Sequence, residues 1–301
     1  MPSSFKNQTI ITRRKMKKAI LAVLSGLLLV TATQSVHAED QKVLAIIDTA
    51  INSDKHPSVI YEACFTLSNS TRCPNKTNFM EGKGSASAPW PTNMNTLTYH
   101  GDWMVKAAIV ANPNIKIVFV RYADVSASGN SINSPEALVK AIAWVANNAE
   151  KYSIDAVSIS QSSISSGNLA KCSTDIATKN AIESLIAKNI PTFAATGNDG
   201  SLTQIGFPSC IPGVTAVGAL ANESTFEKLS NRGPGIDAVA IGKTPITKYN
   251  GSPLDLYGTS AATVKSASLY VGSNTYSTFG QYLGSLNKVL VSNVSYIFTS
   301  K

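Results

Sequence analysis

The sequence predicts a three-layer α/β/α fold, in which a doubly wound and mostly parallel sheet carries helices on both faces. Three observations predict it. Short runs that are apolar on both faces recur along the chain, as in buried parallel strands. Segments with the helical spacing of apolar residues separate these runs. Polar residues directly follow several runs, at the edge of such a sheet where ligands bind.

Five apolar runs are the expected strands of this sheet. The first, KVLAII at residues 42–47, ends directly before Asp48. The other four are NIKIVFV at 114–120, DAVSIS at 155–160, IPTFAA at 190–195 and VTAVGAL at 214–220.

Helices are expected between and after these runs. Ser134-Pro135-Glu136 has the residues that favour a helix start, with Ser as the cap and Pro in the first turn. A second helix is expected over about 173–188, and the stretch FGQYLGSLNKVL at 279–290 is expected to be a short amphipathic helix.

The first 38 residues have the pattern of a secretory signal peptide. Residues 13–18 (RRKMKK) are basic, the 14 residues 19–32 are apolar, and the small residues Val36 and Ala38 precede the expected cleavage site. A membrane anchor or a buried helix is the alternative, but a spanning helix needs about 20 apolar residues. The sequence therefore predicts a signal peptide at 1–38, a single domain at 39–301, and export to the periplasm or the medium without stable membrane association.

Most of the positive charge lies in the expected signal peptide. The whole chain carries +8, but residues 1–38 hold six of its 26 Lys and Arg residues and no acid, so +2 remains after cleavage. This charge gives no basic patch of the kind that binds nucleic acid. The remaining 263 residues suit a single α/β domain, which we expect to be a monomer.

Four cysteines remain after cleavage, and in an exported chain this even number predicts two disulfides. Of the three possible pairings we expect Cys64–Cys73 and Cys172–Cys210. The first two cysteines lie nine residues apart in one loop, and the other two each follow the carboxyl end of an expected strand. A zinc site is not expected, because there is no Cys-x-x-Cys motif and only two histidines remain.

Four polar residues suit acyl transfer. Asp48 follows the first run, His100 begins a segment with helical spacing, Asn198 follows IPTFAA, and Ser260 precedes the small residues 261–267. Each alone has an ordinary explanation, as a turn, packing, loop or cap residue. Together they offer a hydroxyl, a base, an orienting carboxylate and an oxyanion donor. The order Asp, His, Ser differs from that of α/β-hydrolases, which argues against an esterase of that fold.

From Lys42 to Tyr270 the chain resembles the subtilisin-like serine proteases, or subtilases. The matching motifs are VLAIIDTAIN, YHGDWMVKAAIVA, PTFAATGNDG, GFPSCIPGVTAVGAL and YGTSAAT. The resemblance implies that Ser260 is the nucleophile, that His100 is the general base and that Asp48 orients His100. It also implies that Asn198 and the backbone N–H of Ser260 stabilise the oxyanion.

The resemblance also implies a set of substrate-binding residues in two segments. Neither segment contains an acid, so we expect an uncharged residue before the cleaved bond. The chemistry needs no cofactor, and for the calcium that is common in the family the sequence shows no ligand set. The implied residues are Ser158, Ile159, Ser160, Gln161, Ser162, Ala194, Ala195, Thr196 and Gly197.

Several departures from the family pattern keep two functions open. Asp102 and Lys106 stand where Thr and Gly are usual, and Ser162 replaces a usual Gly and is expected to narrow the substrate groove. Only EDQK separates the signal peptide from the first strand, where secreted subtilases usually carry a propeptide. The four intact site residues favour a secreted serine endopeptidase. The departures favour a catalytically impaired subtilase-fold protein that binds peptides or proteins.

Overall fold

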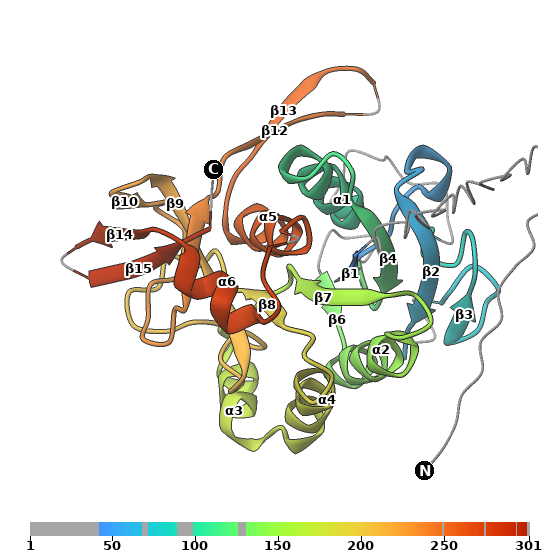
Figure 1. Cartoon of the computed structure of the whole chain (residues 1–301). Coiled ribbons are helices and arrows are strands. Elements are labelled where there is room, and N and C mark those ends of the chain that lie inside the picture. Colours follow the sequence, from blue (N-terminus) through green and yellow to red (C-terminus); the bar gives the residue numbers. More distant parts are fainter. Residues whose placement is uncertain are drawn as a thin grey trace, which may run out of the picture. The chain divides into compact units, whose positions relative to one another are not determined.

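The computed structural model describes residues 42–67, 72–88, 99–125, 131–248, 250–273, 275–292 and 294–299 (Figure 1). The expected signal peptide and its cleavage site lie outside these residues. In the described part, no helix is both long and apolar enough to cross a bilayer.

The strands of the described residues form one large sheet and two small ones. The large sheet contains β1 (Val43–Asp48), β2 (Val59–Phe65), β3 (Phe79–Glu81), β4 (Lys116–Arg121), β7 (Ile154–Ile159), β8 (Thr192–Ala195), β9 (Val214–Asn222), β10 (Thr225–Phe226), β11 (Ala238–Ile241), β14 (Lys288–Val291) and β15 (Val294–Phe298). The small sheets are the pairs β5 (Ala123–Val125) with β6 (Ser131–Asn133), and β12 (Thr244–Thr247) with β13 (Pro253–Leu256).

The helices are α1 (His100–Ala111), α2 (Pro135–Asn148), α3 (Ser166–Thr174), α4 (Ile176–Ile186), α5 (Thr259–Val271) and α6 (Phe279–Ser285), with a 3-10 turn at Ser53–Lys55.

The centre of the large sheet is parallel. Its order is β14-β15-β11-β9-β8-β7-β1-β4-β2-β3, with β10 paired to β9. Neighbours from β2 to β11 and on to β15 are parallel, whereas β3, β10 and β14 pair antiparallel. The five expected strands are confirmed as β1, β4, β7, β8 and β9. Because they run in one direction, their carboxyl ends meet at one edge of the sheet.

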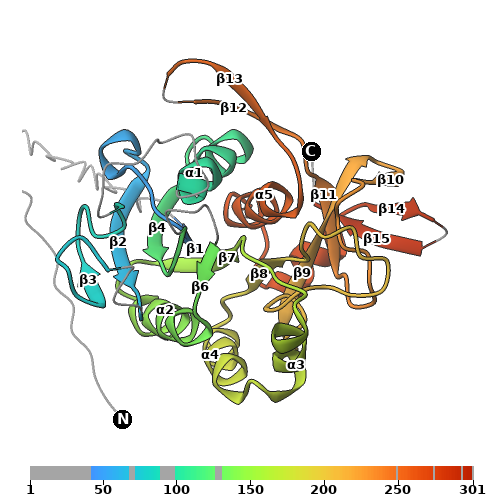
Figure 2. The ribbon, with the colours of Figure 1, turned by 180° about the vertical axis from the view of Figure 1, so that it is seen from behind.

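Helices cover both faces of this sheet (Figures 1 and 2). Strand β1 is buried throughout, and its alternate residues belong to two cores. Val43, Ala45 and Ile47 join the core beneath α2 and α4, whereas Leu44 and Ile46 join the core beneath α1 and α5. The predicted three-layer α/β fold is therefore confirmed.

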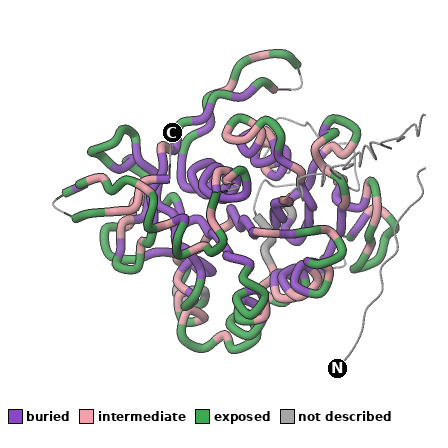
Figure 3. Tube along the Cα trace, in the orientation of Figure 1, coloured by how far each residue is buried: buried purple, intermediate pink, exposed green. Residues whose placement is uncertain are grey.

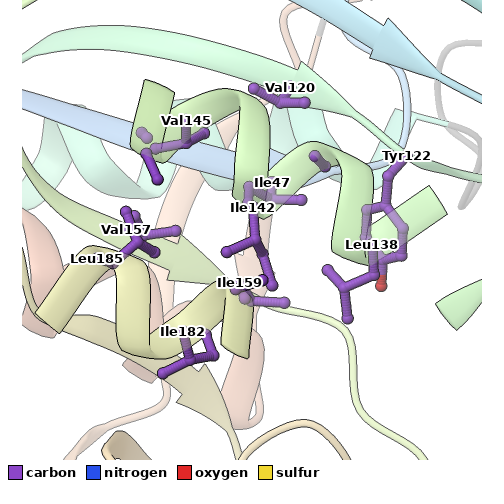
Figure 4. Packing of buried hydrophobic residues seen from close by; sticks show 14 of the residues in the cluster. Ile47, Val120, Tyr122, Leu138, Ile142, Val145, Val157, Ile159, Ile182 and Leu185 are labelled. Carbon is purple, nitrogen blue, oxygen red and sulfur yellow. The ribbon is translucent and has the colours of Figure 1, made fainter. Parts of the chain in front are cut away.

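The two cores differ in the side chains that fill them. In the first, aliphatic residues of α2 and α4 meet those of β1 and β7, as Figure 4 shows for Ile47, Leu138, Ile142 and Val157. In the second, α5 is buried along nearly its whole length (Figure 3). Its small residues, Ala261, Ala262 and Ala267 among them, allow it to approach β7, β8 and β9 closely.

Two helix predictions need correction. The segment expected as one helix over 173–188 is divided at Asp175, whose carboxylate accepts a hydrogen bond from the backbone N–H of Thr178 at 2.9 Å and caps α4. The stretch 279–290 is helical only to Ser285, because Lys288–Val291 pairs as β14 with β15. The helix expected from Ser134-Pro135-Glu136 is confirmed as α2, with Ser134 as its cap.

The four cysteines form two disulfides. Cys64 and Cys73 join β2 to the loop before β3, and Cys172 of α3 joins the loop before β9 at Cys210.

Candidate active site

Asp48 ends the central strand β1 and is fully buried. Its Oδ1 accepts hydrogen bonds from the backbone N–H of Thr49 at 2.7 Å and from Nδ1 of His100 at 2.8 Å. The amide of Gln161 also donates to Oδ1, at 3.4 Å. In the described residues Oδ2 has no hydrogen-bond partner. These contacts fix the carboxylate and direct one oxygen at the imidazole.

His100 is the first residue of α1, and the close approach of Gly101 to the loop after β1 places it there. The backbone N–H of Gly101 donates to Oγ1 of Thr49 at 2.9 Å. A Cβ at Gly101 would lie 2.5 Å from Cζ of Phe119 and 3.0 Å from the Thr49 carbonyl oxygen. Any larger residue would push the helix start, and with it His100, away from Asp48.

Two opposing effects act on the pKa of His100. Burial alone would lower this pKa, but the charge of Asp48 and its hydrogen bond to the imidazole outweigh burial. The pKa of His100 is therefore raised above its ordinary value of 6.5.

Ser260 is the second residue of α5, and Asn198 fixes the start of that helix. Oδ1 of Asn198 accepts from the backbone N–H of Thr259 at 2.9 Å and from its hydroxyl at 3.1 Å. Gly258, with a φ of 98°, provides the tight turn, and a Cβ there would lie 2.6 Å from the same oxygen. Because its oxygen is occupied in this way, the donor side of the Asn198 amide is left for the cleft.

The hydroxyl of Ser260 donates to the carbonyl oxygen of Ser160 at 2.8 Å, and the hydroxyl of Ser160 donates to the carbonyl oxygen of Ser260 at 3.2 Å. In this conformation the Ser260 hydroxyl is not hydrogen-bonded to His100. A rotation about the Cα–Cβ bond is needed before the imidazole can accept its proton.

One open cleft brings the predicted residues together. It has a volume of about 250 Å³ and its lining includes His100, Asn198 and Ser260. Of the predicted substrate-binding residues, Ser160, Gln161, Ser162 and Gly197 line it. The other five are buried beneath it in or beside β7 and β8 and do not line it; they are Ser158, Ile159, Ala194, Ala195 and Thr196.

Sequence reasoning missed Asp199 and Asn231. Asp199 lies two residues beyond Gly197, the last of the predicted substrate-binding residues, and it adds a carboxylate to the cleft lining. Asn231 is fully buried, and its Nδ2 donates to the Thr196 carbonyl and to Oδ2 of Asp199, both at 2.9 Å. Its Oδ1 accepts from the backbone N–H groups of Asp199 and Ser201. The only local signal for Asn231 is its place in the turn-rich stretch SNRGPG, which does not predict so distant a contact.

A buried pair, Glu227 and Lys265, lies behind the start of α5. The Nζ of Lys265 donates to the carbonyl oxygens of Ile241 and Lys243. Burial lowers the pKa of Lys265 from 10.5 to about 8, although the charge of Glu227 acts in the other direction. Burial raises the pKa of Glu227, and this rise is opposed by a hydrogen bond from the Gly258 backbone and by the charge of Lys265.

Solved structures share this fold at low sequence identity. The chain matches a protease from Pseudoalteromonas arctica PAMC 21717 with a TM-score of 0.64 and 18% identity, over 86% of this chain and 87% of that one. It matches the nisin leader peptidase NisP from Lactococcus lactis with a TM-score of 0.60 and 17% identity, over 87% and 86%. For the prenylagaramide maturation protease PagA the TM-score is 0.51 and the identity 22%, over 76% and 74%.

The sequence itself matches a family model. Residues 39–271, which include Asp48, His100, Asn198 and Ser260, match the model of the subtilase family, Peptidase_S8. This match covers most of the chain, so the protein belongs to the subtilase family and is a subtilisin-like serine endopeptidase by class.

Proposed function

We propose that this protein is an exported enzyme that hydrolyses peptide bonds in peptide or protein substrates through Asp48, His100 and Ser260. The observation that carries the proposal is the 2.8 Å hydrogen bond between Asp48 and His100, at a cleft whose lining also includes Ser260 and Asn198. This is the residue set that acyl transfer needs.

The first half of the reaction forms an acyl-enzyme. After Ser260 rotates towards His100, Oγ bonds to the substrate carbonyl carbon while its proton passes to Nε2 of His100. The π electrons of the carbonyl move onto its oxygen. Asp48 holds the imidazolium through Nδ1. His100 then gives the proton to the leaving amide nitrogen as the C–N bond breaks, which leaves an ester on Ser260.

The second half repeats these steps with water. His100 takes a proton from water, the resulting oxygen nucleophile attacks the ester carbonyl, and the proton returns to Oγ as the acid product leaves. In both halves the oxyanion is stabilised by the Asn198 amide and by the backbone N–H of Ser260 at the start of α5.

A second candidate is a protein that binds peptides without cleaving them. The observation that favours it is the hydrogen bond from the Ser260 hydroxyl to the Ser160 carbonyl, which keeps the nucleophile away from its base. In the proposed enzyme this is a resting conformation that ends when substrate binds. In a binding protein Ser260 would keep this conformation when a peptide is bound.

Labelling with a fluorophosphonate distinguishes the two candidates, because it reports a working nucleophile without knowledge of the substrate. We expect the wild-type protein to be labelled and to cleave unfolded casein. Ser260→Ala should lose both, and His100→Ala nearly as much, because the two residues act together. Asn198→Ala should be labelled but should turn over about 10²- to 10³-fold more slowly, the range established for subtilisin, the type enzyme of the family.

The control is Ser224→Ala, which removes an exposed hydroxyl outside the cleft and should change neither readout. A folded, inhibitor-free wild-type protein that neither labels nor cleaves casein between about pH 5 and 10 would establish the binding protein instead.

Export is part of the proposal. It rests on the signal-peptide pattern of residues 1–38, and two disulfides support it because such bonds persist in oxidising compartments. We infer that Glu39 is the first residue of the mature enzyme, which acts as a monomer in the periplasm or the medium. Intact mass of the exported protein tests this: a start beyond Lys42 would remove part of β1 and contradict it.

A further inference from the structure

The hydroxyl of Ser162 is an unused polar group in the wall of the cleft. Its Oγ is buried and has no hydrogen-bond partner among the described residues. Ser162 also lines a smaller pocket that includes Tyr122, Leu138 and Phe207. The side chain therefore stands between the cleft and this second pocket.

Two glycines face this hydroxyl, and the space that their missing side chains leave is the space that Ser162 fills. A Cβ at Gly206 would lie 2.2 Å from Ser162 Oγ, and a Cβ at Gly197 would lie 3.0 Å from it. Gly197 lines the cleft next to Asn198, whereas Gly206 lies behind it and is bonded through its backbone to Thr196. The Ser162 side chain therefore occupies the space beside Gly197 into which a substrate side chain would otherwise extend.

The surrounding backbone is held in place, so this gap cannot widen easily. The N–H of Gly206 donates to the Thr196 carbonyl at 2.8 Å. Ser163 and Phe207 exchange two backbone hydrogen bonds, at 3.1 and 2.9 Å. On the far side the N–H of Asn231 donates to the Gly197 carbonyl at 2.9 Å.

We propose that Ser162 closes the subsite for the side chain before the cleaved bond and restricts that residue to glycine, alanine or serine. This inference rests on the proposed peptidase function for the direction of the substrate, but it concerns binding and not the chemical step. It also makes Ser162 a specificity-determining residue whose substitution by a smaller side chain opens the subsite towards the apolar pocket at Tyr122, Leu138 and Phe207.

The competing determinant is the carboxylate of Asp199, which would favour a basic substrate residue. Its Oδ2 is already bound by Nδ2 of Asn231 at 2.9 Å, and the residue is exposed to water, which weakens its attraction for a cation. We therefore expect the size limit set by Ser162 to determine which substrate residue is preferred before the cleaved bond, rather than the charge of Asp199.

Peptide binding to the Ser260→Ala protein tests the subsite without any need for catalysis. The probes are acetylated tetrapeptides that are identical except for a C-terminal alanine, serine, leucine, phenylalanine or lysine, measured by titration calorimetry. We expect alanine and serine to bind at least tenfold more tightly than the other three. When Ser162→Gly is added to Ser260→Ala, the affinity for the peptides that end in leucine or phenylalanine should increase at least tenfold. Ser162→Ala keeps a Cβ and carries less risk to folding. It should increase the affinity for these two peptides by a smaller factor.

The matched control is Ser165→Ala, an exposed serine three positions further along that does not line the cleft. It should leave all five affinities unchanged. Equal binding of alanine, leucine and phenylalanine, or tightest binding of lysine, would overturn the proposal. The amides of the same peptides, given to the protein with Ser260 intact, keep this result separate from the proposed function. A protein that selects alanine in binding but cleaves neither the amides nor unfolded casein and is not labelled by the fluorophosphonate would refute the peptidase function and leave the subsite assignment in place.

Discussion

Nε2 of His56 lies 2.5 Å from Oδ1 of Asp102, and both side chains are buried. The same Oδ1 accepts from the backbone N–H of Asn52 at 3.1 Å, and Nζ of Lys106 lies 3.6 Å from Oδ2. The two departures in the His100 helix, Asp102 and Lys106, therefore compensate each other, and Asp102 joins α1 to the loop after Asp48.

Replacement of Asp102 should destabilise the protein more than the loss of an exposed ion pair does. In Asp102→Ala the buried His56 loses its hydrogen bond to Asp102, and Lys106 loses its ion pair with that carboxylate. Loss of a buried hydrogen-bond partner costs about 1–3 kcal/mol of unfolding free energy, which urea denaturation measures. The control is Glu183→Ala, which breaks the exposed pair of Lys179 and Glu183 and should cost less than about 1 kcal/mol. Equal losses in the two variants would show that the buried pair is not coupled to stability.

The sequence predicts the centre of the fold better than its edges. Strands β1, β4, β7, β8 and β9 are buried on both faces, so each is a continuous apolar run. Strand β2 lacks this pattern, because Ile60 is exposed and Glu62 is buried. The hairpin of β12 and β13 lacks it too, because its strands contain Pro and Thr. These strands are fixed by pairing with distant segments, which leaves little local pattern.

The candidate site likewise contains residues that the sequence predicts and residues that it does not. Asp48, His100, Asn198 and Ser260 each follow or begin a predictable element, so topology alone brings them to one edge of the sheet. Asn231 contacts a loop more than 30 positions earlier in the chain, and Glu227 is paired electrostatically with Lys265, 38 positions later. Such contacts depend on tertiary structure and cannot be read from spacing.

The burial of Lys265 should make stability depend on pH. Its pKa is about 8 in the folded protein and 10.5 ordinarily, so between these values the unfolded chain binds more protons. The contribution of Lys265 to the free energy of unfolding therefore rises with pH in this window. The Tm of wild type relative to Lys265→Met should increase from pH 7.5 to pH 10. The exposed Lys188→Met is the control and should show no such trend. A difference between wild type and Lys265→Met that stays constant over this range would contradict the assignment.

The two disulfides should contribute unequally to stability. The bond Cys172–Cys210 spans 38 positions and Cys64–Cys73 spans nine. Each bond lowers the entropy of the unfolded chain, and this predicts a stabilisation of about 4 kcal/mol by the first bond and about 2.7 kcal/mol by the second. We expect the double variant Cys172→Ala/Cys210→Ala to unfold at a lower urea concentration than Cys64→Ala/Cys73→Ala. Peptide mapping without reduction provides the control, and a link from Cys64 to Cys172 or Cys210 would invalidate the comparison.

Gln161 should adjust the basicity of His100. Its Nε2 lies 3.4 Å from Asp48 Oδ1 and 3.3 Å from His100 Nδ1, so its amide shares the oxygen that binds the imidazole. This donor weakens the negative potential of Asp48 at His100. Gln161→Met, which removes the donor at similar size, should therefore raise the pKa of His100 further above 6.5.

The pH dependence of kcat/KM measures this change, because only neutral His100 can accept the proton of Ser260. The acidic limb of the profile should lie above pH 6.5 in wild type and should move to higher pH in Gln161→Met. Gln161→Glu places a second carboxylate beside the imidazole and should move it further in the same direction. A limb that stays in place in both variants would show that Gln161 only lines the cleft. A fall in kcat/KM at every pH without a shift of the limb would show a role in substrate binding alone.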